Sequence, residues 1–141
     1  MSSTKRTPSS ANDLTAILLV EIPKAVPGSR VWRMSVGGAY PIESIQPVKA
    51  ALARGDAKAA LEMLNRTRPR MFGAVGLPDI DGILPDGRRL GVEVKWGKDR
   101  QSDEQKVCQT VYDARGGVYI VARDVDSTIA HLKKRALVVS P

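Results

Sequence analysis

The sequence predicts an α/β domain in which a mixed sheet is covered by helices. The first observation is the order of the apolar patterns, which runs helix, strand, helical stretch, hairpin, helix, strand, helix. The second is the turn tripeptide at residues 85–87, Pro-Asp-Gly, between two strand-like segments. The third is a helical segment that can serve as the crossover between two parallel strands. The length of 141 residues suits about one such domain.

The first part of the chain contains a helix and a strand after a polar start. Residues 1–11 are small and polar, so we expect a flexible tail followed by one domain over 12–141. Asn12 or Asp13 can cap a helix that Pro23 should end. The side chains of residues 31–36 then alternate in character, as those of a strand do.

A second helical stretch is predicted over residues 44–64, with Ser44 as its N-cap. Gly55-Asp56 lies in its middle and can divide it into two helices. Residues 67–76 are predicted as a loop. The remaining predicted elements are strands at 77–84, 89–95 and 118–122 and helices at 102–114 and 125–134.

Composition limits the function before any motif is considered. The net charge is +7 and the pI is about 9.9, which favours a polyanionic partner such as DNA, although a basic protein without a nucleic-acid role remains an alternative. The single cysteine, Cys108, and the single histidine, His131, disfavour a Cys/His zinc site or nucleophile pair. The longest apolar run, residues 16–20, is too short to span a membrane, so an intracellular protein is expected.

The central hairpin carries the residues with the clearest chemistry. In a strand over 89–95, Glu93 and Lys95 share one face and Val94 points to the other. Asp79, just before the partner strand, can be brought near Glu93 by the hairpin. Two carboxylates suit Mg²⁺ or Mn²⁺, the Val94 carbonyl is a candidate further ligand, and Lys95 can orient an attacking water. The alternative is an ordinary solvated ion pair between Glu93 and Lys95.

Further residues around this hairpin form a pattern with characteristic spacing. They are Gly76, Pro78-Asp79, Gly82, Gly87-Arg88, Glu93-Val94-Lys95, Gly97, Ser102, Gln105 and Gly116-Gly117, with Val31-Trp32-Arg33 and Gly37 upstream. In this order they resemble the VRR-NUC (virus-type replication-repair nuclease) family of the PD-(D/E)xK superfamily. The resemblance covers about residues 31–38 and 73–132.

The resemblance implies a restriction-endonuclease-like sheet and a metal-dependent DNA endonuclease that hydrolyses phosphodiester bonds. Asp79 and Glu93 would bind the metal and Lys95 would assist the water. Gln105 would lie beside the site, and its alternative role is a capping box with Ser102. Many such nucleases also place an acidic residue of the first helix near the metal. The candidates for that position are Asp13 and, with less favourable spacing, Glu21.

The chain departs from the family pattern in two places. Ser35 stands where the family usually has an asparagine. The connection at about residues 39–72 is longer than usual and forms a basic helical insertion: residues 30–70 contain eight basic and three acidic side chains. This insertion could bind DNA beside the site, or it could be a solvated helix face. The candidate DNA-binding residues are Arg33, Arg66, Arg68, Arg70 and Lys98.

Stand-alone members of the family resemble Holliday-junction resolvases and act as homodimers. The resemblance therefore implies branched DNA as a substrate, a homodimer, and a role in DNA repair in a cell, virus or phage. Two alternatives stay open. One is a non-catalytic DNA-binding module that keeps the nuclease fold, and the other is a basic protein that assembles on another protein.

Overall fold

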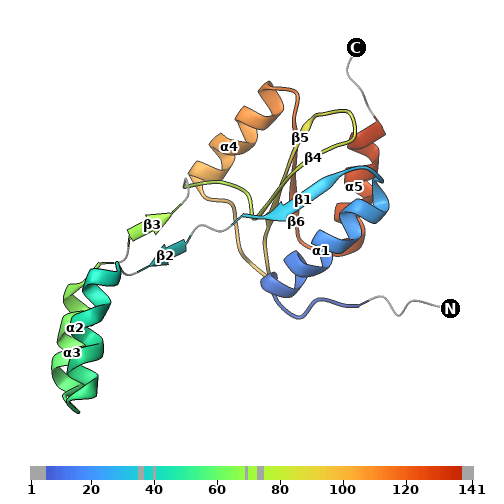
Figure 1. Cartoon of the computed structure of the whole chain (residues 1–141). Helices are drawn as coiled ribbons and strands as arrows, with labels where there is room; N and C mark the ends of the chain where they lie inside the picture. The colour runs from blue at the N-terminus through green and yellow to red at the C-terminus, as the bar shows by residue number, and fades with distance from the viewer. Residues whose placement is uncertain (1–5, 35–36, 40, 69, 73–74, 138–141) are drawn as a thin grey trace. The chain divides into compact units, whose positions relative to one another are not determined.

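The computed structural model describes residues 6–34, 37–39, 41–68, 70–72 and 75–137. The chain forms two compact units, one made of residues 1–34 and 75–141 and the other of residues 35–74. Each unit is described by itself below, with the elements labelled as in Figure 1.

The first unit is built on a four-stranded mixed sheet. Its strands are β1 (Arg30–Arg33), β4 (Ile80–Ile83), β5 (Arg89–Val94) and β6 (Val118–Ala122), in the order β1-β4-β5-β6. The first two pairings are antiparallel and β5 pairs with β6 in parallel. The predicted mixed sheet between helices is thus confirmed (Figure 1).

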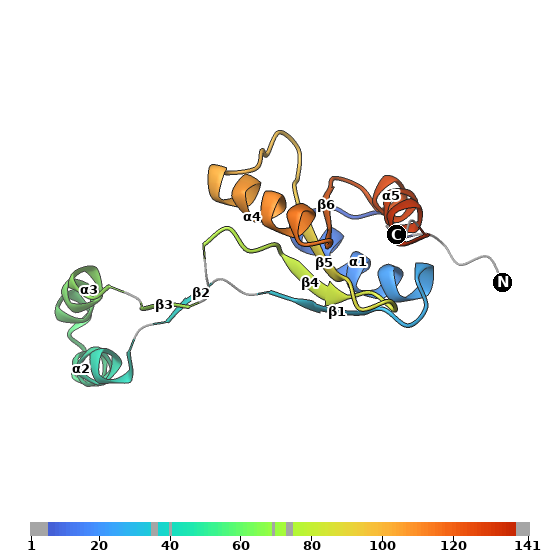
Figure 2. The ribbon, with the colours of Figure 1, turned by 90° about the horizontal axis from the view of Figure 1, so that it is seen from above.

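The two faces of the sheet differ in chemistry. Helices α1 (Ala11–Ala25) and α5 (Val125–Leu137) pack on one face through a core that includes Leu18, Val92 and Leu132. Helix α4 (Asp103–Ala114) lies on the other side of the sheet (Figures 1 and 2). It connects β5 to β6, so the predicted crossover is confirmed. Burial of the apolar face supplies most of the stability of the unit, at about 25 cal/mol per Å² of apolar surface.

Helix α1 corrects two predictions. Its N-cap is Ser10, whose hydroxyl accepts the Asp13 backbone N–H at 3.1 Å, so neither Asn12 nor Asp13 is the cap. Pro23 does not end the helix, which continues to Ala25. Proline is tolerated there because it removes only one N–H near the end of the helix, and the Val26 N–H still bonds the Ile22 carbonyl at 2.9 Å.

The central hairpin forms as predicted. The Leu84 N–H donates to the Arg88 carbonyl at 2.8 Å, and the Gly87 N–H donates to the Leu84 carbonyl at 2.9 Å. Gly87 takes a φ of +88°, which glycine adopts without strain. Helix α5 runs past the predicted end at residue 134, as far as Leu137. Among the residues described, no helix is both long and apolar enough to cross a membrane.

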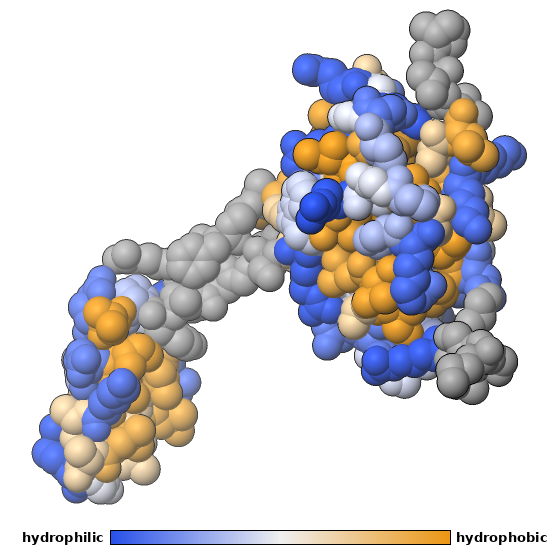
Figure 3. Space-filling model, turned by 45° about the vertical axis from the view of Figure 1, so that its right-hand side comes forward, coloured by the Kyte–Doolittle hydropathy of each residue, from blue (hydrophilic) through white to orange (hydrophobic). Residues whose placement is uncertain are grey.

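The second unit contains the helices α2 (Ile42–Ala53) and α3 (Ala57–Arg66), so the predicted division at Gly55-Asp56 is confirmed. Pro41, not Ser44, is the N-cap of α2. The two helices lie side by side around a small core of Val48, Ala51 and Ala60 (Figure 2). Both hydrophobic and hydrophilic side chains are exposed on the face of this unit seen in Figure 3.

Two short strands complete the second unit. β2 (Gly37–Ala39) pairs antiparallel with β3 (Arg70–Phe72), which lies within the predicted loop over 67–76. The predicted strand over 31–36 is shorter in the structure because β1 ends at Arg33. Ser35, the departure from the family pattern, lies outside the described residues.

Candidate functional site

A row of polar side chains lies on the face of the sheet that α4 covers. The strand register pairs Asp81 with Gly91 and Gly91 with Tyr119, so these residues and Glu93 share one face. Gly91 contributes no side chain to this row. A Cβ at this position would lie 2.8 Å from the ring of Tyr112 of α4. The missing side chain lets α4 approach the sheet beside Glu93.

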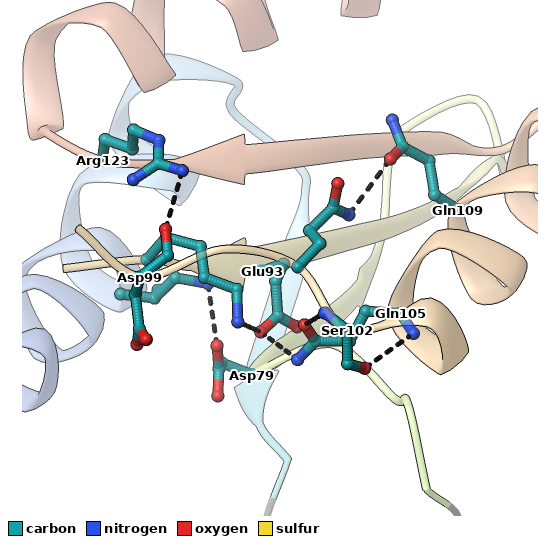
Figure 4. A network of polar contacts seen from close by, with 10 residues as sticks. Asp79, Glu93, Asp99, Ser102, Gln105, Gln109 and Arg123 are labelled. Carbon is teal, nitrogen blue, oxygen red and sulfur yellow. Dashed lines mark hydrogen bonds and ion pairs between the residues drawn. The ribbon is translucent and has the colours of Figure 1, made fainter. Parts of the chain in front are cut away.

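Asp79 reaches this row from the residue before β4. Its Oδ2 accepts the Val94 backbone N–H at 2.8 Å, and its carbonyl accepts the Met34 N–H at 2.8 Å. The carboxylate is therefore held against β5, next to Glu93 (Figure 4). The hairpin brings these two acids together as the sequence led us to expect. The Val94 carbonyl stays a predicted ligand.

Glu93 is the centre of the site and is only 2% exposed. Its Oε1 accepts from Gln105 Nε2 at 2.5 Å and lies 3.3 Å from Lys95 Nζ. Its Oε2 is buried without a hydrogen-bond partner. Lys95 is also buried, so this is not the solvated surface pair that the sequence left open.

The surroundings of Glu93 disfavour its charge. Burial, and after it the negative charge of Asp79, raise the pKa of Glu93 to about 7, while Lys95 acts in the opposite direction. The carboxyl group thus titrates near neutral pH. A cation beside the unpartnered Oε2 would supply the compensation that this oxygen lacks.

Gln105 takes part in the predicted capping box and also contacts Glu93. Its Oε1 accepts the Ser102 N–H at 2.9 Å and the Ser102 hydroxyl accepts the Gln105 N–H at 3.2 Å, which makes a capping box at the start of α4. Its amide nitrogen donates to Glu93 at the same time. The cap therefore fixes the side chain that fixes the Glu93 carboxylate.

The loop after Lys95 is held by contacts that the sequence did not reveal. Arg123, directly after β6, donates to the carbonyls of Asp99 at 2.9 Å and Gly97 at 3.4 Å (Figure 4). Gln101 donates to Gln109 of α4 at 3.1 Å. The sequence shows only that Arg123 directly follows a predicted strand, which does not indicate that it contacts the loop after Lys95.

Asp81, a further carboxylate on this face of the sheet, has partners of its own. Both oxygens accept from Arg89, at 2.7 and 3.1 Å, and one also accepts from the Tyr112 hydroxyl at 3.0 Å. The guanidinium of Arg89 lies 5.7 Å from the centre of the Tyr112 ring. This network joins the hairpin to α4 beside the site.

The structure does not bring the acids of α1 to Asp79 and Glu93. Asp13 is paired with Arg6 at 2.7 Å and accepts the Ser9 N–H at 3.0 Å, and Glu21 is paired with Lys24 at 3.1 Å. Within the part of the chain that is described, no three His, Cys, Asp or Glu side chains are grouped so as to hold a metal ion.

The predicted DNA-binding residues are spread over both units. Arg33 donates to the side chain and carbonyl of Asn12, at 2.6 and 3.2 Å, and Lys98 is exposed in the loop after β5. Arg66 and Arg68 are exposed in the second unit, where Arg70 begins β3.

No family model, curated protein or solved structure matches this chain. The resemblance to the virus-type replication-repair nucleases, and with it the restriction-endonuclease-like character of the sheet, therefore stays a prediction from the quoted residues.

Proposed function

We propose that this chain is a divalent-metal-dependent DNA endonuclease that hydrolyses phosphodiester bonds, on a restriction-endonuclease-like fold. The observation that carries the proposal is the buried Glu93 carboxylate. Gln105 and Lys95 fix one of its oxygens. The other oxygen, Oε2, has no hydrogen-bond partner.

The side chains present fit a hard cation. Glu93 Oε2 is a buried acceptor without a donor, and Asp79 is held nearby by the Val94 amide. Mg²⁺ and Mn²⁺ take oxygen ligands and keep several waters, so these two carboxylates, with the Val94 carbonyl as a third ligand, suit either ion. When bound, such an ion supplies positive charge at the phosphate and lowers the pKa of a water.

Lys95 and Gln105 would position the attacking water and the Glu93 carboxylate. Lys95 Nζ lies next to Glu93 in a buried position, where an ammonium can orient a water for in-line attack on phosphorus. Gln105 holds Glu93 in one orientation and is itself held by the helix cap. Preorganisation of this kind lowers the cost of assembling the transition state.

The substrate class follows from charge. A net charge of +7, of which residues 30–70 supply +5, favours contacts to the phosphate backbone. That the DNA is branched, and that the chain acts as a homodimer, are parts of the proposal that rest on the family resemblance alone.

Cleavage of labelled four-way junctions, flaps and linear duplexes with Mg²⁺ or Mn²⁺ tests the proposal. We expect Asp79→Ala, Glu93→Gln and Lys95→Met to lower the cleavage rate by at least about 100-fold. Asp103→Asn, at an exposed carboxylate of α4, is the matched control and should cleave normally. Unchanged cleavage by Asp79→Ala would rule the assignment out, and preference for linear duplex would rule out the junction substrate.

A second candidate is a DNA-binding module without catalysis. The net charge of +7 favours it, because phosphate contacts need no catalysis, while the intact Asp79, Glu93 and Lys95 argue against it. Salt-dependent DNA binding without cleavage in either metal would replace the first proposal by this one.

A further inference from the structure

Tyr119 of β6 has a hydroxyl group that the packing does not satisfy. The residue is only 1% exposed, and its Oη has no hydrogen-bond partner. In the described part of the chain, the one other buried side-chain atom in this condition is Glu93 Oε2. Buried polar atoms without partners are rare because they give up hydrogen bonds to water on folding. Each such atom therefore points to a ligand, an ion or an internal water.

The two unpartnered atoms belong to one region of the molecule. Tyr119 of β6 pairs with Gly91 of β5, and Glu93 lies two residues after Gly91. The side chains of Tyr119 and Glu93 therefore lie on the same face of the sheet, under α4. Gly91 places no side chain between them. Burial, and next the charge of Glu93, raise the pKa of Tyr119.

Among the described residues, no side chain accepts the hydrogen of the Tyr119 hydroxyl. The Tyr119 ring packs edge-on against Tyr112, with 5.4 Å between ring centres, and the Tyr112 hydroxyl donates to Asp81. Gln101 gives one of its two amide hydrogens to Gln109, and the other can be donated to the Tyr119 oxygen, which still leaves the hydrogen of the Tyr119 hydroxyl without an acceptor. A water is the species that can bond a phenol and a carboxylate together, since it makes about three hydrogen bonds when buried.

We propose that Tyr119 is a positioning residue for Glu93: its hydroxyl and Glu93 Oε2 bind one internal water, which orients the carboxylate toward the cation. The inference rests on the proposed function. A carboxylate oxygen has two lone pairs, so Oε2 can accept from the water and still face a metal ion. Gln105 and Lys95 fix the other oxygen, and Tyr119 completes the orientation from the side of β6.

Tyr112 and Tyr119 provide a matched pair of variants. Tyr119→Phe removes only the hydroxyl and keeps the ring contact, so we expect Mn²⁺ binding, measured by calorimetry, to weaken about tenfold. Its melting temperature should change little, because the hydroxyl loses only a bond to a water, which returns to the solvent. Tyr112→Phe should lower the melting temperature by a few degrees, because Asp81 loses a donor, and change Mn²⁺ affinity by less than about twofold.

A crystal structure of the wild-type chain provides an independent test. A water bonded to both Tyr119 Oη and Glu93 Oε2, absent in Tyr119→Phe, supports the inference. Loss of stability in Tyr119→Phe with unchanged Mn²⁺ affinity, or no such water, overturns it.

Glu93→Gln separates the two proposals. If it abolishes Mn²⁺ binding and Tyr119→Phe does not weaken it, the inference alone fails. If it leaves Mn²⁺ binding unchanged, the proposed metal site is wrong, and the crystallographic water then decides the role of Tyr119 by its presence or absence.

Discussion

Ionised Glu93 lowers the free energy of unfolding by an amount that depends on pH. Its pKa is about 7 in the folded chain and 4.5 for the free side chain. Between these values the folded state binds more protons than the unfolded state, so the stability of the metal-free chain falls as pH rises through this range. The cost is fully present above pH 7 and absent below about pH 4.5.

Replacement of Glu93 by glutamine should therefore stabilise the metal-free chain at pH 8, by about 1–3 kcal/mol, and change it little at pH 5. Urea unfolding in the presence of a chelator at both pH values measures this difference. Glu62→Gln, at an exposed carboxylate of α3, serves as the control and should show no such dependence. An equal effect at the two pH values would mean that burial of the Glu93 charge is not the cause.

The two roles of Gln105 can be separated by a neighbouring substitution. Ser102→Ala removes the cap hydroxyl and should cost about 1 kcal/mol of stability while cleavage is largely kept. Gln105→Ala removes the donor to Glu93 as well, and should lower cleavage about 10–100-fold. Thermal unfolding and cleavage rates on the same preparations test this. Equal cleavage by the two variants would show that Gln105 acts only on the helix.

For single residues, the sequence predicts neighbours along a strand better than contacts between distant parts of the fold. Strand alternation placed Glu93 and Lys95 on one face, and the capping pattern located Gln105. The Asp81 network and the contacts of Arg123 depend on strand register and on where α4 lies. Neither is encoded within a few residues of the sequence, so neither could be predicted from it.

Among the elements, the segment before Asp79 is fixed by a close approach to α4. Gly76 has a φ of +84°, and a Cβ there would lie 2.8 Å from the backbone of Glu104. This contact sets where the chain enters β4 and therefore where Asp79 lies. A side chain at this position must displace the segment.

Gly76→Ala should accordingly lower both stability and cleavage, whereas Gly87→Ala should lower stability only. Gly87 has a similar φ of +88° but open space around it, so its substitution measures the backbone strain alone, about 1 kcal/mol. Unfolding and cleavage assays of the two variants give the comparison. If both variants cleave at the wild-type rate, the contact with Glu104 does not position Asp79.

Elements were predictable where their signals are local. The turn at residues 85–87 and the crossover helix between β5 and β6 follow from turn chemistry and capping. The strands β2 and β3 have three residues each and depend on partners from distant parts of the chain, so their pairing was missed. The cap of α1 was missed because Ser10, Asn12 and Asp13 are all good cap residues within four positions.

For the molecule as a whole, the basic charge of the second unit is the feature to test. Replacing Arg66, Arg68 and Arg70 by glutamine should weaken DNA binding and make the slope of log K against log salt shallower, by about 0.9 for each phosphate that is no longer neutralised. Fluorescence anisotropy at several salt concentrations measures it. A control with Lys24, Lys133 and Lys134 replaced removes the same charge from α1 and α5. If both variants bind DNA equally weakly, the effect comes from net charge and not from this unit.

The insertion of the second unit has a consequence for the order of folding. β1 and β4 are neighbours in the sheet, yet residues 34–79 separate them in the chain. Closing so long a loop in place of a short turn costs about 2 kcal/mol of chain entropy. The hairpin of β4 and β5 needs no such closure, so we expect it to be protected early in pulse-labelled hydrogen exchange and β1 to pair last. Asp79, whose carbonyl accepts the Met34 N–H just beyond β1, would then gain its final support only as folding ends.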